Sequence, residues 1–130
     1  MKIYNFRSSE KNYTLVPNSL IEGPMNTGMS PETIWLILYL LRHKNGKFNL
    51  SIEKLMTQIH CGRDRINRMV REAKAAGYLY YFRAHSSVTG LYVKNEDGWF
   101  ALDFPEKDIS KLNQILNEDA PKNIYLTIVN

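Results

Sequence analysis

The chain has 130 residues, of which 44% are hydrophobic, 12% aromatic and 23% charged, with a formal net charge of +4. This length supports one folded domain with a hydrophobic core, and the composition excludes an intrinsically disordered chain. The single cysteine, Cys61, excludes an internal disulfide, and the longest apolar run, residues 34–41, is too short to cross a bilayer. We therefore expect a soluble, cytoplasmic protein with no membrane partner.

The positive charge is concentrated in the middle of the chain. Residues 42–85 carry ten basic and three acidic side chains, a net charge of +7, whereas residues 1–41 are neutral and residues 86–130 carry −3. A block of this kind is typical of a face that binds a polyanion. A solvated surface gives the same pattern, so charge alone leaves both interpretations open.

The N-terminal part predicts short extended segments followed by a helix. Residues 2–6 and 13–16 have strand composition, and the Gly, Pro and Asn residues of 22–28 predict a loop. A helix then begins with Ser30 as its cap and Pro31 in its first position. Its body is apolar on nearly every side, as in a central core helix, and it is expected to stop at residues 45–46, Asn-Gly.

Two amphipathic helices follow a short extended connector at residues 48–50. Ser51 caps the second helix, the turn is residues 60–62, and the third helix runs from about residue 63 to 76 and ends at Gly77. Apolar residues recur at helical spacing in both. The two predicted buried stripes are Ile52, Leu55, Met56 and Ile59, and Ile66, Met69, Val70 and Ala73.

Beyond Gly77 the pattern changes to strands. Aromatic and β-branched residues alternate with turn residues, and one amphipathic helix interrupts the series. We expect strands at 78–82, 88–93 and 99–102, a loop at 84–87, a turn at 95–98, a helix opening at Pro105 with Ile109, Leu112, Ile115 and Leu116 on one face, and a final strand at 124–129.

Three local patterns carry a resemblance over residues 13–82. They are Leu50-Ser51 opening the second helix, Ile59-His60-Cys61-Gly62-Arg63 leading into an arginine-rich helix, and Ala76-Gly77-Tyr78-Leu79 leading into strands. The chain here resembles the winged helix-turn-helix domains of phage and plasmid replication proteins and of related bacterial transcription regulators. It departs from them at Gly62, where Ser or Thr usually caps the helix, and at Ala73, where Leu often packs.

The expected fold class is α+β, a winged helix-turn-helix with a three-helix core and a β-hairpin wing, plus a C-terminal helix and strand. We expect residues 1–104 to form the winged-helix DNA-binding domain with an N-terminal extension. Residues 105–130 then form a C-terminal helix and strand that are a candidate dimerisation element.

The third helix is the expected DNA-reading element. Its buried stripe turns Asp64, Arg68, Arg71 and Ala75 outward, with Arg63, Asn67 and Lys74 on one shoulder and Arg65 and Glu72 on the other. Arg pairs with guanine and Asn with adenine in the major groove, which admits a helix. The alternative is a solvated face with Arg–Asp and Arg–Glu pairs. The candidate DNA-binding residues here are Arg63, Arg65, Asn67, Arg68, Arg71 and Lys74.

Contacts to phosphates are expected from two other places. The loop that contains Arg83 and Ser86 is the expected wing, and Lys44 and Lys47 follow the first helix. Each of these is also compatible with an ordinary surface turn.

Catalysis and cofactor binding have no supporting pattern. The three histidines are separated, His60-Cys61 lacks further ligands at zinc spacing, and no glycine-rich phosphate loop is present. We therefore expect a protein that is not an enzyme and has no cofactor, metal or small-molecule ligand.

The expected function is binding of double-stranded DNA, as a phage- or plasmid-type transcriptional regulator or replication accessory factor. The alternative is a protein–protein interaction module that engages a host protein through its acidic C-terminal third. The sequence leaves open whether the chain is a monomer or a homodimer. A dimer is expected to use the helix face at 109–116 or the strand at 124–129, which needs covering by residues 2–6 or by a second copy.

Overall fold

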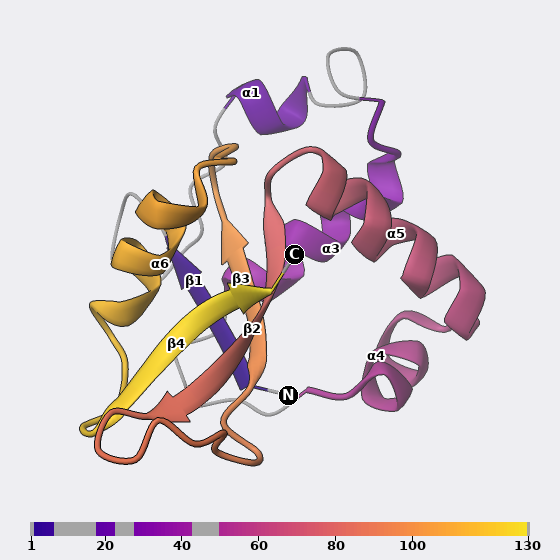
Figure 1. The fold of residues 1–130 in the computed structure, drawn as a ribbon. Coiled ribbons are helices and arrows are strands. Elements are labelled where there is room, and N and C mark those ends of the chain that lie inside the picture. The colour runs from indigo at the N-terminus through magenta and orange to yellow at the C-terminus, as the bar shows by residue number, and fades with distance from the viewer. Residues whose placement is uncertain (1, 7–17, 23–27, 43–49, 130) are drawn as a thin grey trace.

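In the computed structural model of the protein, the described residues are 2–6, 18–22, 28–42 and 50–129. The helices α3 (Pro31–Leu41), α4 (Ile52–Ile59) and α5 (Arg63–Ala75) cover one face of a four-stranded sheet, and α6 (Ile109–Asn117) covers the other (Figure 1). A short helix, α1 (Asn18–Ile21), precedes α3. The strands are β1 (Lys2–Phe6), β2 (Leu79–Ser86), β3 (Gly98–Leu102) and β4 (Ile124–Val129), in the order β1-β3-β2-β4.

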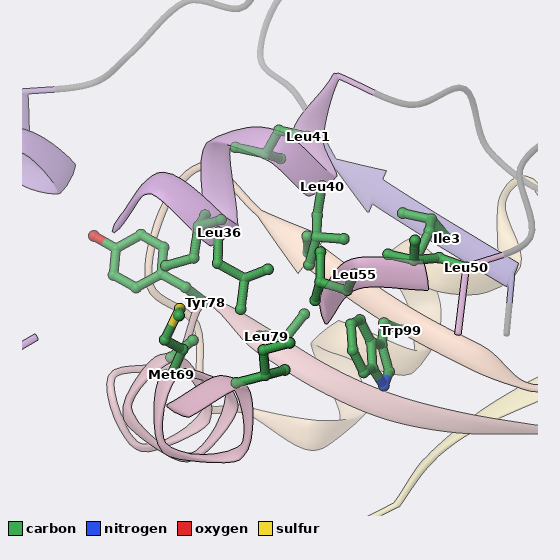
Figure 2. Packing of buried hydrophobic residues seen from close by; sticks show 14 of the residues in the cluster. Ile3, Leu36, Leu40, Leu41, Leu50, Leu55, Met69, Tyr78, Leu79 and Trp99 are labelled. Atoms are coloured by element: carbon green, nitrogen blue, oxygen red, sulfur yellow. The ribbon is translucent and has the colours of Figure 1, made fainter. Parts of the chain in front are cut away.

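Two hydrophobic cores lie on opposite faces of this sheet. Successive strand residues point to opposite faces, so Leu79 and Trp99 pack under the helices α3, α4 and α5, whereas Tyr80 and Phe100 pack under α6. Figure 2 shows the first core, in which Leu36 and Leu40 of α3 and Leu55 of α4 meet the sheet residues. The sheet is therefore the middle layer of three, and it fixes the position of α5.

The helix boundaries follow the predicted caps. The Ser30 hydroxyl oxygen accepts a hydrogen bond from the Thr33 amide at 3.4 Å, and that of Ser51 accepts one from the Lys54 amide at 3.1 Å. Gly77 adopts φ +86°, and the next amide, of Tyr78, donates to the carbonyl of Ala73 at 3.0 Å. The expected glycine stop of α5 is confirmed, and so are the two buried stripes, whose members are buried or packed partly buried against the core.

The turn between α4 and α5 occupies residues 60–62 as expected. His60 takes the left-handed conformation at φ 54°, which ends α4, and its amide donates to the Met56 carbonyl. Gly62 then stands at the N-cap of α5 without a side-chain cap. The α4–turn–α5 unit thus brings a second helix across the first with a three-residue connection.

The hairpin after α5 differs from the expectation. β2 continues through Ala84, His85 and Ser86, so the predicted loop at 84–87 is wrong over its first three residues. The predicted strand at 88–93 is also wrong, since only an isolated bridge joins Tyr92 to His85. The physical reason is the partner of β2. Its polar end pairs with β4, in the register Ala84–Leu126, His85–Tyr125 and Ser86–Ile124. Residues 88–93 meet β2 only through that bridge and two flanking backbone bonds, from the Ser86 amide to the Leu91 carbonyl and from the Val93 amide to the Ala84 carbonyl.

The C-terminal helix and strand both form, but the expected helix start at Pro105 is wrong: α6 begins at Ile109, where the Asp108 side chain caps it by accepting from the Ser110 amide. β4 pairs antiparallel with β2 and lies at the opposite edge of the sheet from β1, so pairing with residues 2–6 is wrong. Two asparagines of α6 bind the backbone at the outer edge of β4. The Asn117 side chain accepts from the Leu126 amide at 2.7 Å and donates to the Leu126 carbonyl at 2.8 Å, and Asn113 accepts from the Ile128 amide at 2.8 Å.

These contacts occupy, within the chain, parts of the two surfaces that we expected in a dimer, the apolar face of α6 and the edge of β4. Leu112 and Leu116 of α6 are buried against the sheet, and the backbone of β4 is bound on both sides. The C-terminal strand β4, which lies in the segment 105–130, belongs to the same sheet as β1, β2 and β3. The predicted strand at 13–16, the helix stop at 45–46 and most of the connector at 48–50 lie outside the described residues.

Candidate nucleic-acid interface

Helix α5 is held against the N-terminus of α3 by Glu72. Its carboxylate accepts hydrogen bonds from the Ser30 amide and the Thr33 hydroxyl, each at 2.8 Å. The Ser30 backbone bond, with the side-chain bonds of Thr33 and Ser30 and the charge of Arg68, holds the pKa of Glu72 below its usual value. Because Thr33 is fully buried, this contact fixes α5 on the core.

Two of the candidate DNA-binding arginines, Arg65 and Arg68, are paired with a glutamate of α3. Both Arg65 and Arg68 bind the carboxylate of Glu32, Arg65 through two of its nitrogens and Arg68 at 2.7 Å. Arg68 also lies 3.7 Å from Glu72. The hydrogen bond from Arg65 is the main cause that lowers the pKa of Glu32. These two arginines therefore sit on the flank of α5 that packs beside α3.

Arg63 is paired as well, with Glu53 of α4 at 2.5 Å. All three of these ion pairs are about half exposed on the arginine side. Exposed pairs contribute little to stability, so a phosphate can compete for the arginine. The glutamates of these three pairs lie on α3 and α4, so the pairs join α5 to the two other helices.

A second arc of α5 is exposed and carries no such pairs. It consists of Asp64, Asn67, Arg71 and Lys74, spaced so that they line one side of the helix, and we call it the open arc. Within the described residues, neither Arg71 nor Lys74 has an acidic partner. The open arc thus offers an amide and two cations to a ligand at no cost in internal contacts.

The predicted wing residues are placed as follows. Arg83 lies within β2 with an exposed side chain, opposite Thr127 of β4. The Ser86 hydroxyl oxygen accepts from the amides of Val88 and Thr89, at 3.2 Å each, so it shapes the turn that follows β2. Lys44 and Lys47 lie outside the described residues.

Other kinds of site find little support. No group of three His, Cys, Asp or Glu side chains within the described ranges is arranged to hold a metal ion. A hollow of about 340 Å³ beside the α4–α5 turn is lined by Trp35, Ile59, Cys61 and Met69 together with polar side chains. Among the helices that the structure describes, none has the length and apolar character of a membrane span.

A comparison with protein families agrees with this geometry. Residues 27–79 match the family model described as "Helix-turn-helix domain", which spans α3, α4, α5 and the start of β2. No curated protein and no solved structure matches the chain. The chain therefore contains a helix-turn-helix domain of the kind found in regulators and replication proteins. With the hairpin of β2 and β3 behind α5, its fold is α+β and winged-helix, as the sequence predicts. A helix-turn-helix domain indicates DNA as the partner.

Proposed function

We propose that the protein binds double-stranded DNA by placing the open arc of α5 in the major groove. The observation that carries this proposal is that Asn67, Arg71 and Lys74 are exposed together on one side of α5 while its other arginines are held by Glu32 and Glu53. A major groove about 12 Å wide admits a helix whose outer side chains reach base edges.

The residues of α5 take different roles in this proposal. Arg71 and Asn67 contact base edges, because a guanidinium pairs with guanine and an amide with adenine. Lys74 and Arg63 contact phosphates at the two ends of the helix, and Arg63 gives up its exposed bond to Glu53 to do so. Arg65 and Arg68 act mainly as positioning residues, since their bonds to Glu32 hold α5 at a fixed angle to α3.

The proposed biological role is that of a phage- or plasmid-type transcriptional regulator or replication accessory factor. Its support is the resemblance carried by Leu50-Ser51, by residues 59–63 and by residues 76–79. We propose a cytoplasmic binding protein rather than an enzyme. Operators of such domains commonly contain two half-sites, so binding as a pair of copies on DNA is part of the proposal.

The test is selection of genomic fragments by the purified full chain, followed by binding of the retained duplex at increasing salt. Neutralising Z phosphates gives a slope of about −0.9Z in a plot of log K against log salt. We expect a steep negative slope and one enriched sequence. Retention of no sequence over background, or an affinity independent of salt, would favour the alternative of a protein–protein module that engages its partner through residues 86–130.

A further inference from the structure

The hollow beside the α4–α5 turn has the size and the lining of a small-molecule site. Its volume of about 340 Å³ falls within the range of about 300–1,000 Å³ that is typical of such sites. Its apolar lining comes from α3, α4, the turn and α5, through Trp35, Ile59, Cys61 and Met69. Met69 is buried, and Ile59 and Cys61 pack partly buried against the first core. The lining of the hollow is therefore continuous with that core.

Trp35 is the exposed aromatic side chain of this lining. It is 46% exposed, whereas Trp99 is buried in the first core. Its ring stacks on that of Tyr39, with centroids 5.2 Å apart and planes at 16°. The Tyr39 hydroxyl in turn donates to the side-chain oxygen of Gln58 on α4 at 3.3 Å. An indole that is held on one neighbour and still exposed can stack on a further planar ring.

The polar side chains of the hollow offer mainly hydrogen-bond donors. The carboxylate of Glu32 is already bound by both Arg65 and Arg68. A guanidinium has five N–H donors, and among the described residues Arg65 uses two of them, both on Glu32, so three remain. The oxygen of Gln58 accepts from Tyr39, which leaves the Gln58 amide nitrogen as a donor. These donors favour a ligand with a carboxylate over a cationic ligand, which would compete with two arginines for Glu32.

We propose that the hollow binds a small aromatic carboxylate, whose ring stacks on Trp35 and whose carboxylate accepts hydrogen bonds from Arg65. The ring removes the apolar lining from water, and the carboxylate uses the arginine donors that Glu32 leaves free. The hollow touches α5 at Arg65 and Met69, which lie outside the open arc, so the inference does not rest on the proposed function. No local sequence pattern indicates this site, because its lining residues come from three helices.

The test is a calorimetric titration of the full chain, in the absence of DNA, with naphthoate, with its neutral amide and with acetate. Naphthoate should bind about tenfold more tightly than naphthamide, because the amide loses the charge-assisted hydrogen bonds to Arg65. Acetate, which has the carboxylate without the ring, should show no binding. Acetate that binds as tightly as naphthoate, or naphthamide that binds as tightly, would overturn the assigned ligand class.

Cys61 reports whether the ligand occupies the hollow. It is the single cysteine of the chain and it lines the hollow, so alkylation by iodoacetamide labels one known position. Mass spectrometry then measures the labelling rate, which bound naphthoate should lower in proportion to its occupancy. Binding of naphthoate that leaves this rate unchanged would place the ligand elsewhere and overturn the inference.

Arg65→Gln and Arg68→Gln are a matched pair, because both arginines bind Glu32 whereas Arg65 alone of the two lines the hollow. Arg65→Gln should weaken naphthoate binding about tenfold and leave naphthamide binding unchanged, and Arg68→Gln should leave both unchanged. Trp35→Leu should weaken the binding of both ligands. Thermal unfolding checks that each variant is folded.

Equal losses in the two arginine variants would show a general effect of charge and overturn the inference. A Trp35→Leu variant that binds naphthoate like the parent, or no binding by the parent up to the solubility limit of naphthoate, would also overturn it. Since no DNA is present, these outcomes leave the proposed role of the open arc untouched.

Discussion

Glu72 of α5 and Thr33 of α3 are joined by a hydrogen bond of 2.8 Å between residues 39 positions apart in the sequence. Thr33 is a fully buried polar side chain, and the carboxylate of Glu72 also accepts the Ser30 amide at the start of α3. One acidic residue of α5 thus stabilises the fold. It occupies an otherwise unpaired amide at the helix N-terminus, where negative charge is favoured.

Glu72→Ala should lower the free energy of unfolding by about 2 kcal/mol, because it leaves the Ser30 amide and the Thr33 hydroxyl without their charged acceptor. Chemical denaturation measures the change. Glu118→Ala, which removes an exposed carboxylate at the end of α6, is the matched control and should change stability little. Equal stability of the two variants would show that the Glu72 contact does not hold α5 in place.

The same contact predicts a dependence of stability on pH. The pKa of Glu72 is lowered from its ordinary value of 4.5, first by the bond from Ser30. A carboxyl group with a lowered folded pKa contributes stability that is complete above the ordinary pKa and is lost as the pH falls through the folded value. Unfolding by urea between about pH 6 and pH 3 should show a smaller loss in Glu72→Gln than in the parent. Parallel losses in the two proteins would contradict this assignment.

Helical spacing predicted which residues of α5 are buried and which are exposed, because that depends on the helix alone. Ile66, Met69 and Ala73 are buried as expected. Spacing did not reveal that Arg65 and Arg68 meet Glu32, since their partner lies 33 and 36 positions away and the approach depends on how α5 crosses α3.

The paired and open sides of α5 should therefore differ in their effect on sequence preference. A variant with Arg65→Ala and Arg68→Ala should select the same DNA sequence as the parent, and its stability should fall only slightly, because exposed ion pairs contribute little. Asn67→Ala serves as the comparison and should lose its preference at one base pair. A change in the selected sequence for the Arg65/Arg68 variant, with Asn67→Ala unchanged, would place the reading surface on the α3 side.

The outer edge of β4 gives a prediction about self-association. Asn113→Ala with Asn117→Ala leaves the Leu126 backbone and the Ile128 amide without partners, which should cost about 2 kcal/mol and expose an edge for pairing with another chain. Gln114→Ala, at an exposed position of the same helix, is the control. Sedimentation should show association that depends on concentration only in the asparagine variant. Identical behaviour of both would mean that the asparagines do not protect the edge.

The C-terminal part shows where sequence patterns were insufficient. The segment 88–93 has apolar residues typical of a strand, and Ala84, His85 and Ser86 have the composition of a loop. In the structure, however, Ala84, His85 and Ser86 belong to β2, and the segment 88–93 has only an isolated bridge at Tyr92. Strand pairing decides this outcome. β4, whose first residue lies 38 positions after Ser86, supplies the backbone partners that local composition does not encode. The existence of β4 itself, and the apolar face of α6, were predicted correctly.

The most direct test of the DNA-reading role of the open arc is the affinity of Arg71→Ala for the duplex selected by the parent. Arg71 is exposed, lies off the buried stripe and has no ion pair among the described residues, so its loss should leave the fold and the far-ultraviolet circular dichroism unchanged. A fluorescence anisotropy titration should show binding weaker by about 1–3 kcal/mol if the guanidinium contacts a base. A folded Arg71→Ala variant that binds the selected duplex as tightly as the parent would contradict the assignment of α5 as the reading helix.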